Sequence, residues 1–175
     1  DQACRLAGAL RELGVTRGDR VVLMIRNRPE FHIADTAVVL LGATPISIYN
    51  SSSAEQVAYL TGHCDGSIAI IEDADYLARF VEARPSLPRL REIVMIEGDP
   101  TDLAEGVLAW SDLLTHAPGD LDELARIAQP SDLATVIYTS GTTGPPKGVM
   151  LDHENIAWTA ECLRRCLADL STEGL

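Results

Sequence analysis

Runs of apolar residues alternate along the first hundred positions with stretches in which apolar side chains recur at helical spacing. Short runs rich in apolar and β-branched residues occupy positions 21–25, 44–49, 67–71 and 93–96. Such runs are typical of strands buried on both faces of a sheet. Between them, apolar residues three or four positions apart predict amphipathic helices. Strands that alternate with helices of about ten to fifteen residues predict an α/β fold, with βαβ units around a partly parallel sheet.

Residues typical of a helix start mark the beginnings of three of these helices. Pro29 suits a first helical turn, where a backbone N–H would have no intrahelical partner. Ser53 can cap the next helix, and Gln56 three positions later makes a capping box possible. Asp73 is a candidate cap for a helix over 74–83. The acidic residues around this cap are therefore interpreted as a helix start rather than as a metal site.

The pattern changes after the fourth run. Residues 97–131 hold short helical pieces separated by glycine and proline, with too few apolar residues for a core of their own. We expect an irregular connecting region there, within a single domain. A last amphipathic helix is predicted with Asp152 as its N-cap, and Trp158 is expected to be in the core or half-buried. Its predicted apolar face consists of Ile156, Ala160, Leu163, Leu167 and Leu170.

A loop rich in hydroxyl and glycine residues follows the apolar run of residues 133–138, which predicts a buried strand. The loop offers four hydroxyls, three glycines at which a backbone can approach a ligand closely, and one lysine. These residue types suit a polyphosphate, because phosphate oxygens accept short hydrogen bonds and the lysine charge can follow the anion. The candidate phosphate-binding residues are Thr139, Ser140, Gly141, Thr142, Thr143, Gly144 and Lys147.

Two common nucleotide motifs do not explain this loop. Lys147 follows Pro146 and precedes Gly148, so the Walker A pattern G-x-x-x-x-G-K-[ST] is not met. No G-x-G-x-x-G occurs, which excludes the dinucleotide fingerprint. By residue type alone, a surface loop rich in Ser, Gly and Pro that binds nothing is the alternative to a phosphate-binding loop.

Composition and charge exclude several other classes. The net charge of −12 and the pI near 4.6 oppose binding to nucleic acid or to an anionic membrane surface. No apolar run reaches the roughly 18 residues of a transmembrane helix, so we expect a soluble, cytoplasmic protein. The four cysteines show no disulfide pattern and are expected to be free thiols. His32 and His63 lie beside apolar helical positions and are interpreted as packing or surface residues.

The loop and its flanks carry a resemblance to a known family. YTSGTTGPPKGVML, residues 138–151, resembles the phosphate-binding signature of the adenylate-forming superfamily, which includes acyl-CoA synthetases, luciferases and amino-acid adenylation domains. IYNSSSAEQVAYL, residues 48–60, is similar to the corresponding segment of the long-chain fatty-acid–CoA ligases. Asp152 departs from the Ser or Thr that is commoner there, although it keeps the helix cap.

This resemblance implies a two-step reaction. The carboxylate of a fatty acid attacks ATP to give acyl-AMP and pyrophosphate, and coenzyme A then takes the acyl group. The loop from Thr139 to Lys147 would hold the β- and γ-phosphates, Thr142 would lie beside Mg²⁺, and Lys147 would supply a catalytic positive charge. ATP, Mg²⁺, coenzyme A and a fatty acid are thus the expected cofactors and substrate.

The resemblance covers nearly the whole chain but only an N-terminal part of the family's architecture. Residues 1–175 correspond to part of the large AMP-binding domain, and the small C-terminal domain has no counterpart. We therefore expect an incomplete ligase that is inactive alone, with the downstream half of the ligase as an expected partner. The alternative is a non-catalytic α/β interaction or regulatory module derived from such a ligase.

Overall fold

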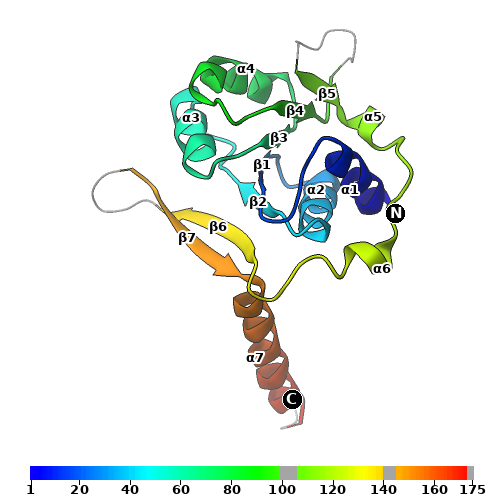
Figure 1. Ribbon diagram of the computed structural model, residues 1–175. Coiled ribbons are helices and arrows are strands. Elements are labelled where there is room, and N and C mark those ends of the chain that lie inside the picture. Colours follow the sequence, from blue (N-terminus) through cyan, green and yellow to red (C-terminus); the bar gives the residue numbers. More distant parts are fainter. Residues whose placement is uncertain (99–105, 140–144, 173–175) are drawn as a thin grey trace.

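A five-stranded parallel sheet forms the centre of the molecule (Figure 1). The computed structural model describes residues 1–98, 106–139 and 145–172. The strand order is β2-β1-β3-β4-β5, and each neighbouring pair is parallel. The strands are β1 (Arg20–Met24), β2 (Thr44–Ser47), β3 (Ile68–Ile71), β4 (Glu92–Met95) and β5 (Val107–Ala109). The predicted α/β fold with a parallel sheet is confirmed.

Four helices cover this sheet, two on each face (Figure 1). They are α1 (Gln2–Glu12), α2 (Pro29–Leu40), α3 (Ala54–His63) and α4 (Ala74–Ala83), and a 3-10 turn, η1 (Arg84–Ser86), follows α4. Alternate strand residues face opposite sides: Val21 and Ile70 pack with α1 and α2, whereas Val22 and Ile71 pack with α3 and α4. All four side chains are fully buried, because helices cover both faces.

The predicted caps of α3 and α4 are confirmed. The Ser53 hydroxyl accepts a hydrogen bond from the Gln56 amide at 3.3 Å, and the Gln56 side chain accepts one from the Ser53 amide at 3.0 Å. Asp73 Oδ1 accepts from the backbone N–H groups of Asp75 and Tyr76 at 3.1 and 3.2 Å. Each cap satisfies helix-terminal N–H groups that otherwise have no protein partner.

Residues 106–131 contain one strand that the sequence did not predict. Strand β5 extends the main sheet, with Val107 opposite Ile93 and Ala109 opposite Met95. Three residues are too few to show an alternating pattern, so the strand is defined by its pairing with β4. Short helical pieces were predicted around residues 110–114 and 121–128, and the structure has α5 (Trp110–Leu113) and a shorter α6 (Leu121–Leu124) there.

A separate antiparallel hairpin follows, formed by β6 (Leu133–Thr139) and β7 (Lys147–Asp152). The prediction that residues 133–138 form a strand is confirmed, but the prediction that the strand is buried is wrong. Ala134 and Tyr138 are buried, whereas Ile137 is 49% exposed. Only one face of β6 packs against the larger part of the molecule, so alternate residues stay in solvent.

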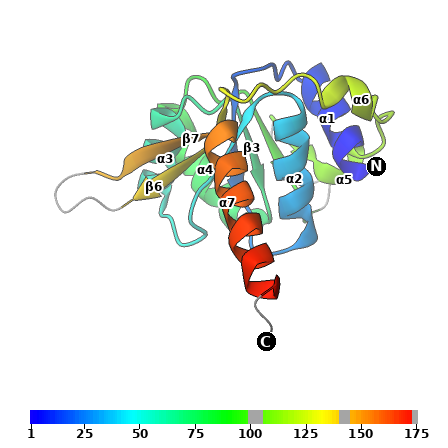
Figure 2. The same ribbon diagram turned by 90° about the horizontal axis from the view of Figure 1, so that it is seen from below.

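Helix α7 (His153–Thr172) extends away from the parallel sheet (Figures 1 and 2). Its predicted N-cap is confirmed, because Asp152 Oδ1 accepts from the Asn155 amide at 2.7 Å. The expectation that Trp158 is in the core or half-buried is wrong: it is 69% exposed. Of the predicted apolar face, Ile156, Leu163 and Leu167 are also exposed, and the side chain of Leu170 lies outside the described part. Amphipathic spacing predicted a helix here, but no described element covers its apolar side.

Within the described residues, no helix combines the length and the apolar character needed to span a membrane.

Candidate functional site

The tip of the β6–β7 hairpin brings together two of the predicted phosphate-binding residues. Thr139 ends β6 and Lys147 begins β7, and they are opposite each other in the antiparallel register. The Thr139 hydroxyl donates to the Lys147 carbonyl at 3.5 Å. Both side chains are exposed. The other predicted residues, Ser140, Gly141, Thr142, Thr143 and Gly144, lie outside the described residues.

Lys147 is the only lysine in the sequence, and its charge is free to meet an external anion. It forms no ion pair with any described residue. Many arginines, by contrast, already have carboxylate partners, such as Arg26 with Glu72 at 2.9 Å and with Asp73 at 2.6 Å. An exposed ammonium group at a hairpin tip beside a hydroxyl group suits a phosphate ligand.

Gly148 allows the two strands of the hairpin to pack closely. It pairs with Tyr138 across the strands, and a Cβ atom at Gly148 would lie 2.7 Å from Val136 Cγ1 and 3.4 Å from Tyr138 Cε1. The first of these distances is shorter than real Cβ contacts. Within the described residues, this glycine therefore has a packing role next to Lys147.

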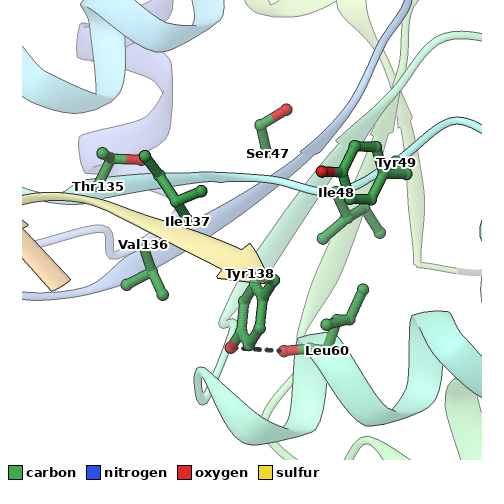
Figure 3. A pocket seen from close by; sticks show the side chains of 8 residues that line it. All are labelled: Ser47, Ile48, Tyr49, Leu60, Thr135, Val136, Ile137 and Tyr138. Carbon is green, nitrogen blue, oxygen red and sulfur yellow. Dashed lines mark hydrogen bonds between the residues drawn. The ribbon is translucent and has the colours of Figure 1, made fainter. Parts of the chain in front are cut away.

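Two cavities lie between the hairpin and the larger part of the molecule. The first, of about 220 Å³, is lined by residues of β2, α3 and β6 and has mainly apolar walls (Figure 3). The second, of about 540 Å³, reaches the hairpin tip. Its walls include Tyr49, Tyr59, Tyr138, Pro145 and Pro146. The cavity is also lined by Ser51, Ser52, Gln56 and the carboxylate of Glu55. Its aromatic and proline walls suit a partly apolar ligand, and an anionic group of that ligand would lie towards Lys147 and away from Glu55.

Hydroxyl groups attach the first half of β6 to β2. The buried Thr44 side chain donates to the Leu133 carbonyl at 2.8 Å. Thr135 donates in the other direction, to the Pro45 carbonyl at 3.4 Å. These bonds satisfy one carbonyl of β6 and one of β2, and they hold the hairpin to the parallel sheet without a shared strand ladder.

Helix α3 contacts the hairpin near its tip. The Tyr59 hydroxyl donates to the Pro146 carbonyl at 3.0 Å, and His63 Nδ1 lies 3.0 Å from the Tyr138 hydroxyl. Burial is the main cause that raises the pKa of Tyr138, with nearby Cys64 adding to it, so this hydroxyl keeps its proton at neutral pH. From the sequence, Tyr59 has no predicted role, and His63 is predicted only to be a packing or surface residue. No spacing signal connects them with a loop about eighty positions later.

The base of the hairpin carries a bidentate ion pair. Arg17 Nε and Nη2 donate to the two carboxylate oxygens of Asp132 at 2.8 and 2.6 Å. Asp132, next to β6, also accepts from the Gln129 amide at 2.9 Å. The hydrogen bond from Arg17 is the main cause that lowers the pKa of Asp132 from 3.8 to about 2.

We expect the Asp132→Asn variant to be less stable than the wild type at pH 7, by a margin that shrinks as the pH falls from about 4 towards 2. The carboxylate has a lower pKa in the folded chain than in the unfolded chain, so its ion pair stabilises the fold above about pH 4. That stabilisation is lost as the pH falls towards 2. Urea unfolding from pH 7 to pH 2.5 measures the difference. Arg17→Gln should cause the same loss, and the double variant no further loss; a pH-independent difference would contradict this explanation.

No described group of three or more His, Cys, Asp or Glu side chains is placed to hold a metal ion. Asp73 caps α4 and pairs with Arg26, as the interpretation of a helix start requires. The predicted metal neighbour, Thr142, lies outside the described residues. All four cysteines are free, and burial is the main cause that raises the pKa of Cys64 to about 11.

Comparison with known proteins gives consistent matches. The model of the AMP-binding enzyme family matches residues 1–172. The chain is 32% identical over 164 residues to the long-chain-fatty-acid–CoA ligase ACSBG2 of Xenopus laevis, covering 91% of this chain and 22% of that protein. It is 38% identical over 149 residues to the long-chain-fatty-acid–CoA ligase FadD15 of Mycobacterium tuberculosis, covering 82% and 24%.

Solved structures agree with this match. The anthranilate CoA ligase AuaEII, in complex with anthranoyl-AMP, superimposes with a TM-score of 0.79 at 27% identity, over 91% of this chain and 30% of that one. A putative long-chain-fatty-acid CoA ligase from Rhodopseudomonas palustris has the same fold, with a TM-score of 0.78 and 24% identity, over 94% of this chain and 39% of that one. The chain thus spans less than a quarter of the length of these two curated relatives.

Proposed function

Because the chain belongs to the AMP-binding enzyme family, we propose that it is part of a fatty-acid–CoA ligase. Its curated relatives carry the name of long-chain-fatty-acid–CoA ligases, and they match nearly the whole chain. The ligase would activate a fatty acid as acyl-AMP and then transfer it to coenzyme A. This two-step reaction is proposed for the whole ligase and not for these 175 residues alone, which span less than a quarter of such relatives.

Within that ligase, the β6–β7 hairpin would bind the β- and γ-phosphates of ATP. When bound, ATP supplies the phosphoanhydride bond whose cleavage activates the fatty acid, and coenzyme A supplies the thiol. Thr139 would exchange its long hydrogen bond to the Lys147 carbonyl for one to phosphate, and the predicted ligands of residues 140–144 would add further donors. Lys147 would balance the charge that develops on pyrophosphate as it leaves. Thr142 is the proposed neighbour of Mg²⁺.

The unpaired ammonium group of Lys147 is the observation on which this assignment depends. Lys147 is exposed, has no carboxylate partner among the described residues, and lies opposite a hydroxyl residue. A charge-assisted hydrogen bond to phosphate therefore requires no ion pair within the described chain to break. The residues present fit a polyphosphate in both charge and hydrogen-bond donors.

Protection of Lys147 from acylation tests the proposal. An N-hydroxysuccinimide ester should acetylate this single lysine, and mass spectrometry of the peptide that contains it gives the rate. We expect ATP or pyrophosphate at several times its dissociation constant to slow acetylation about fivefold, because a bound anion occupies the ammonium group. Adenosine, which has no phosphate, is the matched control. Equal rates with and without millimolar pyrophosphate would refute phosphate binding at the hairpin.

A further inference from the structure

We propose that Tyr59 and His63 of α3 are positioning residues that fix the tip of the β6–β7 hairpin and thereby the place of Lys147. The inference rests on the proposed function, since it concerns how the phosphate-binding end is held. It assigns a role in ligand binding to a helix that lies about eighty positions earlier in the chain. The two side chains are four residues apart on α3, so they lie on the same helix face.

Tyr59 acts on the β7 side of the tip. Its hydroxyl donates to the Pro146 carbonyl at 3.0 Å. That carbonyl and the Lys147 amide belong to one planar peptide unit, so the bond orients the first peptide of β7. The proline ring restricts its own φ angle near −65°, which leaves this peptide few other orientations. A side chain of α3 thus holds the peptide unit that contains the backbone N–H of Lys147.

His63 acts on the β6 side of the tip. Its Nδ1 lies 3.0 Å from the hydroxyl of Tyr138, the residue directly before Thr139. The same hydroxyl donates to the Leu60 carbonyl at 3.5 Å (Figure 3). Tyr138 therefore contacts α3 at two points. The rings form a row, with centroids 5.5 Å apart for Tyr59 and His63 and 5.7 Å apart for His63 and Tyr138. Helix α3 therefore contacts both strands where they enter the tip.

A two-stranded hairpin is only marginally stable by itself, so these contacts matter for the position of its tip. Strand β6 pairs with β7 and shares no backbone ladder with the main sheet. Its hydroxyl-mediated bonds to β2 lie at Leu133 and Thr135, away from the tip. The α3 contacts are the described ones next to Thr139 and Lys147. Holding these two residues before a ligand arrives reduces the entropy lost on binding.

The Tyr59→Phe variant separates positioning from packing. It removes one hydroxyl and keeps the ring in the cavity wall. Because Tyr59 and Pro146 are only half-buried, water can reach the freed carbonyl, so little stability should be lost. Tyr76→Phe is the matched control: it also removes one tyrosine hydroxyl, but Tyr76 lies on α4 and lines neither cavity beside the hairpin.

The test measures pyrophosphate binding by calorimetry with the full 175-residue chain. We expect Tyr59→Phe to weaken binding about three- to tenfold with an unchanged urea midpoint, because a less ordered Lys147 loses more entropy on binding. His63 is exposed, and His63→Ala should weaken binding similarly, whereas Tyr76→Phe should match the wild type. Wild-type affinity in both α3 variants, or an equal loss in Tyr76→Phe, would overturn the inference.

Backbone ¹⁵N relaxation of Lys147 distinguishes failure of this inference from failure of the proposed function. If the wild type binds no pyrophosphate, the proposed function fails, and the order parameter of Lys147 still tests positioning. A lower order parameter in Tyr59→Phe than in Tyr76→Phe supports the role of α3. Equal order parameters in the two variants would overturn it.

Discussion

Replacing Lys147 with alanine is expected to weaken the binding of ATP and pyrophosphate by roughly ten- to hundredfold. The variant loses the only lysine of the chain, whose charge has no carboxylate partner among the described residues. A hydrogen bond to a charged group contributes about 1.5–3 kcal/mol, which corresponds to that range of affinity. Calorimetric titration of the wild type and of Lys147→Ala with pyrophosphate measures the loss of affinity. This loss should be smaller at high salt, because the site is exposed and its charges are screened.

Arg89→Ala is the matched control for Lys147→Ala, since it changes the net charge equally. Arg89 is exposed and forms only a long contact of 3.9 Å with Asp65. Its removal should change the affinity less than twofold, because an exposed single pair contributes little. Lys147→Arg keeps the charge but changes its geometry, so an intermediate affinity is expected. An Arg89→Ala variant as weak as Lys147→Ala would show that net charge, and not the hairpin, attracts the anion.

Replacing Phe80 with alanine is expected to lower the free energy of unfolding by about 3–5 kcal/mol. Phe80 lies on α4, is fully buried, and packs in the apolar core between the sheet and the α3–α4 layer. Deleting its ring removes apolar burial and leaves a cavity that neighbouring strands can fill only in part. Urea unfolding at pH 7, followed by circular dichroism, measures the change.

The neighbouring residue Val81 supplies the control for Phe80. It lies on the same helix but is 50% exposed, so Val81→Ala should change the stability by no more than about 0.5 kcal/mol. Nearly equal losses in the two variants would mean that α4 does not cover the sheet as described. The same layer contains α3, so the stability of this core also supports the helix that holds the hairpin.

Much of the fold could be predicted from local sequence. The apolar runs predicted four strands of the main sheet, because a strand covered on both faces has to be apolar throughout. Ser53, Asp73 and Asp152 predicted helix starts, because capping requires only a side-chain oxygen beside the first free N–H groups. The candidate phosphate residues were found for a similar reason: they are consecutive in the chain and need no folding to come together.

The remaining features depended on contacts between distant segments. Strand β5 is too short to have a pattern, and its pairing with β4 defines it. Exposure was predicted wrongly for β6 and for Trp158, because hydrophobic spacing shows which residues share a face but not whether another element covers that face.

The sequence by itself thus determined four strands of the parallel sheet, the helices that cover it and the chemical character of the loop. Only the tertiary structure decided that Tyr59 and His63 meet the hairpin, since side chains about eighty positions apart become neighbours through packing and not through local preference.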